Sequence, residues 1–536
     1  MGQPKWASPS LAESSRGLAH LVRRCSSGLG GHYGRPQQVN ARESAALWGQ
    51  PLGDLHVLER LSPAVAANRF GLGARPGELA QIGSQPQDWL RAQIAGGPPL
   101  VADSELRSSA ETLARALDAR RELRAAKRAA ATERMSQSQD AADAPNQANA
   151  VAALMKVGQI YRPVYIAEAS ARFRQAVSTD RPLVERLTYF WTNHFAVSVD
   201  KNLVLGLAGS LEREAIRPNV LGRFSDMLLA VERHPAMLLY LDNHVSVGPH
   251  SKAARLLERR QSGRRVGINE NLARETLELH TLGVRGGYTQ ADVTTFAEVI
   301  TGWSIGGDVG RFPRGEPGEF LFRSELHEPG AKVVLGKRYS DTGYDQGVAV
   351  LRDLAAKPAT AHFIATKLAR HFIADDPPPR SVERIANAFL SSDGHLPTVY
   401  RALIETPESW AQPLSKYKTP TDYIVSTFRG LELPVDAGRS PLAPFEVMGQ
   451  RTYSPGSPAG WPDRSADWDG ASALIKRIEW ADAVGQRVGS RRDAVALAPE
   501  LLGDNLTPAT RTAIARAASS SQAVTLLLSS PEFMRR

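Results

Sequence analysis

One predicted helix constrains the fold of this chain more than any other segment. Residues 182–195, with the sequence PLVERLTYFWTNHF, are apolar on most sides when they are drawn as a helix. A helix of this kind is stable only when other elements cover it on nearly every side. Similar buried-looking helical patterns recur through residues 180–430 without a linker. The sequence therefore predicts a large multi-helix body.

The helical pattern is interrupted within this body at about residues 304–345. The interruption is rich in Gly and Pro and contains two short strand candidates, 319–322 and 332–336. Helical periodicity resumes near residue 345. The predicted fold class is therefore mainly α, with a small β-containing insertion near 304–345.

The remaining segments differ from this body in composition. Residues 1–50 are rich in Ser, Gly and Pro without periodicity, and we expect a disordered leader. Residues 51–435 are assigned to the main helical domain, with a flexible linker at 136–150 (SQSQDAADAPNQANA). Residues 436–536 combine a Pro/Gly-rich segment with C-terminal helices, which we expect to pack on the main body.

The charge does not indicate a nucleic-acid partner. The chain carries 65 Lys and Arg against 56 Asp and Glu, a net charge of +9. Residues 1–50 hold six basic and two acidic residues, so nearly half of the excess lies in the expected leader. The basic residues are not interleaved with aromatic residues, as they are on a base-stacking surface. We therefore expect no nucleic-acid binding.

Export and membrane insertion are not predicted either. No apolar run approaches the roughly 18 residues that a transmembrane helix needs. The pair Arg23-Arg24 is followed by no apolar segment of the kind that an export signal requires. We expect a cytoplasmic protein; the alternative is a periplasmic or envelope-associated one with a mis-assigned start.

The single cysteine, Cys25, limits the available chemistry. It excludes an intramolecular disulfide framework and a metal site built from thiolates. The sequence also lacks a phosphate-binding P-loop, a G-x-S-x-G elbow and an H-E-x-x-H motif. Any chemistry would fall to His, Asp, Glu, Arg and Lys, with a hard divalent cation as the candidate cofactor.

Polar residues concentrate within the apolar helices between residues 185 and 335. The densest run is NENLARETLELHTLG, residues 269–283. At 100° per residue, four of its side chains share one helix face: Asn271, Arg274, Glu275 and Glu278. His280 lies about 200° from Glu278, which weakens a metal site of the E-x-x-E-x-H type. The two glutamates could share a cation or a proton, or nearby arginines could neutralise them in a buried ion-pair network.

Further candidates lie outside this run. His194 falls on an apolar helix face, where a histidine is either a satisfied core residue or a base. Arg213 and Arg217 are spaced i,i+4 and could clamp a carboxylate or phosphate, or pair with the two glutamates. His327 and Trp303 are loop candidates.

Several long motifs resemble one known family. They are FWTNHFAVS, EREAIRPNVLGRFSDMLLAVERHPAMLLYLDN, GINENLARETLELHTLGVRGGYTQADV and ITGW, with supporting stretches HEPGAKVVLGKRY, FIATKLARHF, KTPTDYIVSTFRGL and SPAGWPD. In this order they are similar to the domain-of-unknown-function 1800 family, over roughly residues 55–536. The resemblance implies an uncharacterised bacterial protein with no established activity. It also implies an envelope-associated habit and a sulfatase-like protein, encoded nearby, as a partner.

Two functional hypotheses follow, and whether the chain is an enzyme is left open. The first is an acid/base or metal-assisted hydrolase with a carboxylate/His/Arg pocket. Its catalytic residues would be His194, Glu275, Glu278 and His327, and its substrate-binding residues Arg213, Arg217, Asn271, Arg274 and Trp303; no metal ligand is assigned. The alternative is a non-catalytic binding or assembly protein in which these residues form a buried ion-pair network.

Overall fold

The computed structural model describes residues 61–101, 103, 105–135, 145–259, 267–307, 314–435 and 441–536. The leader expected at residues 1–50 lies outside the described residues, as does the part of the expected linker at 136–144. Residues 145–150, which were also predicted to be linker, belong instead to a long helix that begins at Pro145. Residues 60–536 form one compact unit.

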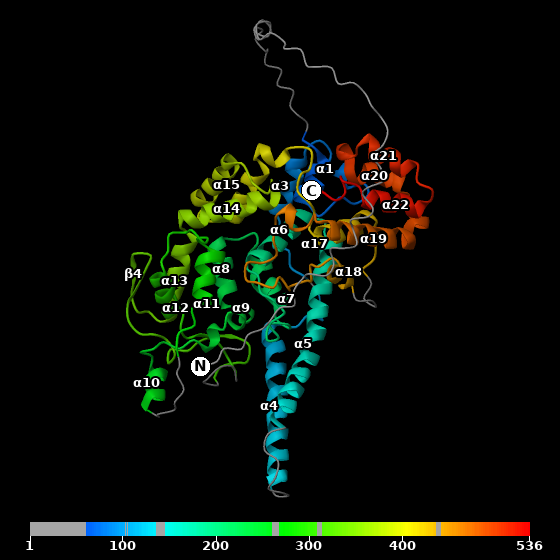
Figure 1. Cartoon of the computed structure of the whole chain (residues 1–536). Coiled ribbons are helices and arrows are strands. Elements are labelled where there is room, and N and C mark those ends of the chain that lie inside the picture. The colour runs from blue at the N-terminus through cyan, green and yellow to red at the C-terminus, as the bar shows by residue number, and fades with distance from the viewer. Residues whose placement is uncertain are drawn as a thin grey trace, which may run out of the picture. The chain divides into compact units, whose positions relative to one another are not determined.

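Helices make up most of this unit (Figure 1). Those that precede the insertion are α1 (Pro63–Val65), α2 (Glu78–Ile82), α3 (Pro86–Ile94), α4 (Ser109–Met135), α5 (Pro145–Ser178), α6 (Pro182–His194), α7 (Ala208–Leu211), α8 (Phe224–Arg233), α9 (Pro235–Tyr240), α10 (Lys252–Arg259), α11 (Asn271–Glu275) and α12 (Gln290–Val299). Those that follow it are α13 (Tyr344–Ala355), α14 (Pro358–Phe372), α15 (Pro379–Ser391), α16 (Leu396–Ile404), α17 (Pro420–Gly430), α18 (Ala443–Val447), α19 (Ala471–Val488), α20 (Ala494–Leu502), α21 (Pro508–Ala515) and α22 (Ser520–Leu528). None of the helices described is long and apolar enough to cross a membrane.

The insertion contains two small antiparallel pairs of strands. Strand β1 (Trp303–Ile305) pairs with β2 (Phe320–Phe322), and β3 (Lys332–Val334) pairs with β4 (Lys337–Tyr339). The fold class predicted from the sequence, mainly α with a small β-containing insertion, is confirmed. The first strand begins one residue before the expected boundary.

Helix α6 lies in the interior, as its sequence predicts. It begins with Pro182 at its first position, where the missing N–H costs nothing. Leu187 and Trp191 are fully buried, and so are the charged residues Glu185 and Arg186. A charge at such a site must find a partner of opposite sign, because an unpaired buried charge is costly.

The C-terminal segment enters the same core. Apolar residues from Val65 to Met534 form one continuous cluster. Residues 534–536 run antiparallel to residues 416–418: Lys418 N–H donates to the carbonyl of Met534 (2.9 Å), and Arg536 N–H donates to that of Lys416 (2.8 Å). This pairing carries the side chain of Arg536 into the interior, where it is 1% exposed.

Three π-helical turns occur within the described helices. They are Ala66–Phe70, Glu212–Ile216 and Thr276–His280. A π-turn is wider than an α-turn, and it is often found at functional sites. The third one continues α11, so the 100° spacing assumed for residues 269–283 does not hold beyond Glu275. The angle predicted between Glu278 and His280 assumed that regular spacing.

The second π-turn leads into a buried ion-pair network. Arg217, just after that turn, contacts Glu185 of α6 (2.9 and 2.5 Å) and Glu212 (2.7 Å). All three side chains are 1% exposed. Arg172 of α5 also contacts Glu212, at 2.7 Å. The network ties α5, α6 and the π-turn together.

We predict that Arg217→Met will destabilise the protein strongly. The variant keeps most of the side-chain volume but leaves Glu185 with no counter-charge in the described part of the chain. Breaking a buried pair in this way costs about 3–5 kcal/mol. Urea denaturation measures the loss. Arg223→Met, which removes an exposed pair with Asp393, is the control and should cost less than about 1 kcal/mol. Equal losses in the two variants would contradict the prediction.

Candidate active site

A cavity of about 360 Å³ opens between α6, α14, the start of α17 and the irregular segment 450–467. Its wall combines aromatic side chains such as Tyr189 and Trp461 with many ionisable ones. A volume of this order suits a small organic molecule.

A histidine–aspartate pair lies in the wall of the cavity. His371, the penultimate residue of α14, donates from Nδ1 to both carboxylate oxygens of Asp463 (3.0 and 3.1 Å). Because a carboxylate only accepts, Nδ1 carries the proton and Nε2 keeps a lone pair. The buried Nε2 has no hydrogen-bond partner among the described residues. Burial lowers the pKa of His371 to about 4, so the ring is neutral at pH 7.

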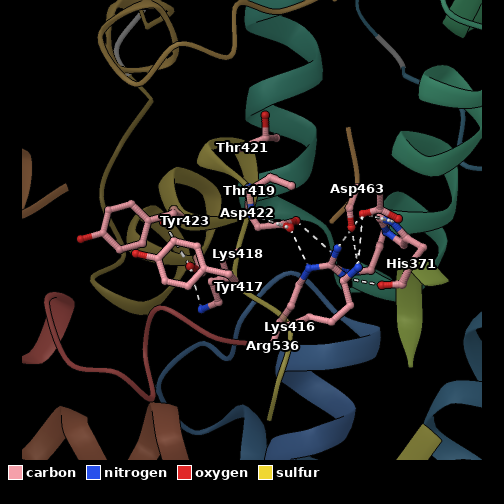
Figure 2. Close-up of polar contacts among 12 residues, drawn as sticks. His371, Lys416, Tyr417, Lys418, Thr419, Thr421, Asp422, Tyr423, Asp463 and Arg536 are labelled. Carbon is pink, nitrogen blue, oxygen red and sulfur yellow. Dashed lines mark hydrogen bonds and ion pairs between the residues drawn. The ribbon is translucent and has the colours of Figure 1, made fainter. Parts of the chain in front are cut away.

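Arg536 holds Asp463, whose side chain is partly exposed, beside the buried carboxylate of Asp422. Its guanidinium lies between them, 2.9 Å from Asp422 and 3.3 Å from Asp463, and it donates to the carbonyl of His371 at 2.6 Å (Figure 2). Arg186 contacts the other oxygen of Asp422 at 3.0 Å. The pKa values of both carboxyl groups lie well below their usual range, since neighbouring cations and hydrogen bonds outweigh burial.

Lys416 supports the same pair from the other side. Its ammonium donates to the carbonyl of Asp463 (2.5 Å), the carboxylate of Asp375 (2.8 Å) and the carbonyl of Arg370 (2.8 Å). These bonds fix the backbone of Asp463 and the end of α14 relative to each other. The histidine–aspartate geometry is thus fixed by groups that do not belong to either residue.

His194 is a second histidine in the cavity wall. It is 1% exposed, and its Nε2 donates to the carbonyl of His280 (3.1 Å). Its Nδ1 has no partner among the described residues. Burial places the pKa of His194 well below the usual value, so it is a neutral ring with a lone pair. The sequence-based choice of His194 therefore falls on a residue of the cavity.

The segment that carries Asp463 is fastened to α6 by one amide side chain. Asn193 donates to the carbonyl of Trp461 (2.9 Å) and accepts from its N–H (2.7 Å). Gly460 comes so close to α6 that a Cβ at this position would lie 2.3 Å from the carbonyl oxygen of Asn193. These contacts place Trp461 and Asp463 over the end of α6.

The predicted glutamate face does not reach the cavity. Glu275 and Glu278 are half-buried, and Asn271 is exposed. Arg274 contacts Glu270 (2.8 Å) and Glu278 (3.7 Å), but these side chains are about a third exposed, and no ion pair of Glu275 is found among the described residues. Burial raises the pKa of Glu275. None of these four predicted residues lines the cavity.

The predicted arginine clamp is occupied by carboxylates. Arg213 contacts Glu168 (2.8 Å), and Arg217 contacts Glu185 and Glu212. The expectation that they pair with Glu275 and Glu278 is wrong. Other glutamates lie closer to them: Glu168 on α5, Glu185 on α6 and Glu212 at the start of the π-turn.

The two remaining candidates lie in and beside the insertion. Trp303 is fully buried at the start of β1, against Phe320 and Tyr344. His327 is buried and contacts the carbonyl of Thr301 through Nδ1 (3.0 Å). Neither lines the cavity, so among the nine predicted site residues only His194 does so.

The residues that the sequence-based choice missed were present in the motifs. His371 lies in FIATKLARHF, Asp422 in KTPTDYIVSTFRGL and Asp463 in SPAGWPD. In these stretches the ionisable residues are spread among apolar and small ones, so a search for local polar density passes over them. The signal that pointed to them was the recurrence of these stretches as family motifs.

No metal centre emerges from the described residues. They contain no group of three or more His, Cys, Asp and Glu side chains that could hold a metal ion.

Comparison with known families places this geometry in context. Residues 65–535 match the model of the family described as "Protein of unknown function (DUF1800)". The chain belongs to this family. The match covers nearly the whole chain, so α6, α14, α17 and the 450–467 segment of this DUF1800 protein all lie within the family domain. No curated protein and no solved structure shows a significant match.

We predict that Asn193→Ala will loosen the segment over the cavity without unfolding the DUF1800 domain. The variant loses two hydrogen bonds to the backbone of Trp461. We expect amide hydrogen exchange across residues 459–463 to become roughly 10- to 100-fold faster. Asn219→Ala, which loses only a bond to the carbonyl of Ala215, is the control and should leave that segment unchanged. Unaltered exchange in Asn193→Ala would count against this role.

A second prediction concerns Lys418, which is 1% exposed. Its ammonium donates to Ser426 (3.1 Å) and lies 4.3 Å from the ring centre of Phe533. No carboxylate lies within 4.0 Å of it among the described residues. Burial lowers its pKa from 10.5 to about 7.

The ammonium proton of Lys418 is therefore bound more tightly in the unfolded chain than in the folded chain. As a result, Lys418 makes the free energy of unfolding rise between about pH 7 and pH 10.5. We expect Lys418→Met to be more stable than the wild type at pH 6, by about 1–4 kcal/mol. The difference should shrink as pH approaches 10. Urea denaturation at several pH values measures it, with the exposed Lys476→Met as control. A variant less stable than the wild type at pH 6 would rule the explanation out.

Proposed function

We propose that this protein is a hydrolase that works by acid–base catalysis, with the cavity as its active site. The observation that carries the proposal is the Asp463–His371 pair in the cavity wall. A carboxylate that fixes the tautomer of a histidine, with the distal nitrogen left unpaired, is the arrangement of a general base. Arg536 and Lys416 hold that carboxylate in place.

The chemistry follows from the protonation states. His371 is neutral at pH 7, so Nε2 can accept a proton from a water molecule as its oxygen attacks the carbon, phosphorus or sulfur atom at the centre of an ester. The imidazolium that forms is stabilised by the adjacent carboxylate of Asp463. The same proton then passes from Nε2 to the leaving group, which restores the neutral ring. No residue changes its net protonation over the cycle.

The alternative, a non-catalytic protein with a buried ion-pair network, explains Arg213 and Arg217 but not the Asp463–His371 pair. Arg213 and Arg217 are saturated by carboxylates and therefore support the helical body. His371 and His194 both line the cavity, and each keeps a buried ring nitrogen without a partner among the described residues. An ion-pair network gives no reason for this combination.

We predict that His371→Gln will abolish hydrolysis with little change in stability. The test substrates are the p-nitrophenyl esters of acetate, phosphate and sulfate, followed by release of p-nitrophenol. We expect kcat/KM to fall by about 100-fold or more, the usual contribution of a general base. His362→Gln, an exposed histidine of the same helix, is the control and should keep full activity.

The pH profile gives a second readout of the same variant. Activity should fall as pH decreases through about 4, where His371 becomes protonated and can no longer accept a proton. A wild-type protein that hydrolyses none of the three esters, or a His371→Gln variant with wild-type activity, would contradict the proposed function.

A further inference from the structure

The cations of the cavity wall fall into two groups. Four arginines have a carboxylate within 4.0 Å: Arg172 with Glu212, Arg186 with Asp422, Arg451 with Asp200 and Arg464 with Asp376. The other two, Lys367 and Arg370, have none in the described part of the chain. Both belong to α14 and are three residues apart, which places them on neighbouring positions of one helix face.

Lys367 is a cation without a polar partner. It makes no hydrogen bond or ion pair with any described residue, and its nearest marked contact is the ring of Phe363, 5.6 Å from the ammonium. Two charged groups act on it: Asp463 of the 450–467 segment and Arg370 on its own helix. The titratable ring of His194 on α6 also interacts with it, but that ring is neutral. Burial and the neighbouring Arg370 lower the pKa of Lys367 to about 8, even with Asp463 opposing them.

Arg370 is only partly satisfied. Its Nε donates to the carbonyl of Asp375 at 3.2 Å. Its two terminal nitrogens make no hydrogen bond to the residues that the structure describes. A guanidinium with free terminal nitrogens matches the two oxygens of a planar or tetrahedral anion, while an ammonium acts as a point charge beside it.

Two cations one helical turn apart repel each other, and in a half-buried wall this repulsion is poorly screened. An anion between them would remove the repulsion and supply hydrogen-bond acceptors to both. We infer that Lys367 and Arg370 form an oxyanion-binding subsite of the cavity, so that its ligand is a small organic molecule with a carboxylate, phosphate or sulfate group. This inference rests on the proposed function, since it names the substrate class of the same cavity.

The position of the subsite suits that role. Arg370 and His371 both line the cavity, so an anion bound at Arg370 would share the cavity with the proposed base. A cavity of about 360 Å³ admits a small molecule and excludes a folded partner. The anionic group would thus position the bond to be broken relative to Nε2 of His371.

Calorimetric titration of the full chain with sodium sulfate, phosphate and acetate tests the inference. The His371→Gln background is used, so that binding is measured separately from catalysis. We expect saturable binding of at least one anion. Lys367→Gln and Arg370→Gln should each weaken it by roughly 10-fold or more, because each removes a charge-assisted contact. Lys367→Arg should retain most of the affinity.

The controls separate charge loss from unfolding. Lys476→Gln removes an exposed positive charge on α19 and should bind like the parent; melting temperatures confirm that every variant is folded. Absence of saturable binding for all three anions would overturn the inference. So would folded Lys367→Gln and Arg370→Gln variants that bind the anion as tightly as the parent protein does. If binding requires Lys367 and Arg370 but ester hydrolysis does not require His371, the subsite stands and the proposed function fails. If ester hydrolysis requires His371 but anion binding does not require Lys367 and Arg370, the proposed function stands and the subsite is rejected.

Discussion

The cavity depends on a single buried guanidinium, that of Arg536. Asp422 and Asp463 are brought together from α17 and from the 450–467 segment, and without a cation between them they would repel each other. Arg536 contacts both carboxylates and also the backbone of His371. One side chain therefore connects three of the elements that line the cavity: α14, α17 and the 450–467 segment. Because an uncompensated charge at this depth costs several kcal/mol, the three elements are expected to keep their arrangement as a set.

The fold was predictable where a long stretch has a distinctive composition. Helix α6 is apolar on most sides, and the insertion is marked by its Gly and Pro content, so the number of alternatives was small. Helix α12 likewise begins with a local pattern, a reciprocal capping box formed by Thr289 and Asp292. The departure from regular α-helical spacing at residues 276–280 has a definite cause. A π-turn widens the helix locally, and no residue type in that stretch indicates where the regular spacing ends.

The site was harder to predict for a related physical reason. Local density of charged residues selects ion-pair networks as readily as catalytic sites, since both need polar groups within apolar helices. The glutamates and arginines chosen from the sequence mostly serve such networks. The cavity instead takes isolated residues from distant segments: His371 and Asp463 are 92 positions apart, and Asn193 and Trp461 are 268. Only the fold shows that these residues meet.

Two lysines illustrate how the same physical effect leads to different consequences. Burial lowers the pKa of both Lys418 and Lys367, because each lacks a carboxylate within ion-pair distance in the described structure. Lys418 is enclosed by Ser426 and Phe533, so its unfavourable ionisation is a permanent cost to the folded state. Lys367 borders a cavity, and a bound anion would recover the corresponding free energy as affinity. A buried charge without a partner thus lowers the stability of a closed core. At the wall of a cavity, the same kind of charge favours the binding of an anionic ligand.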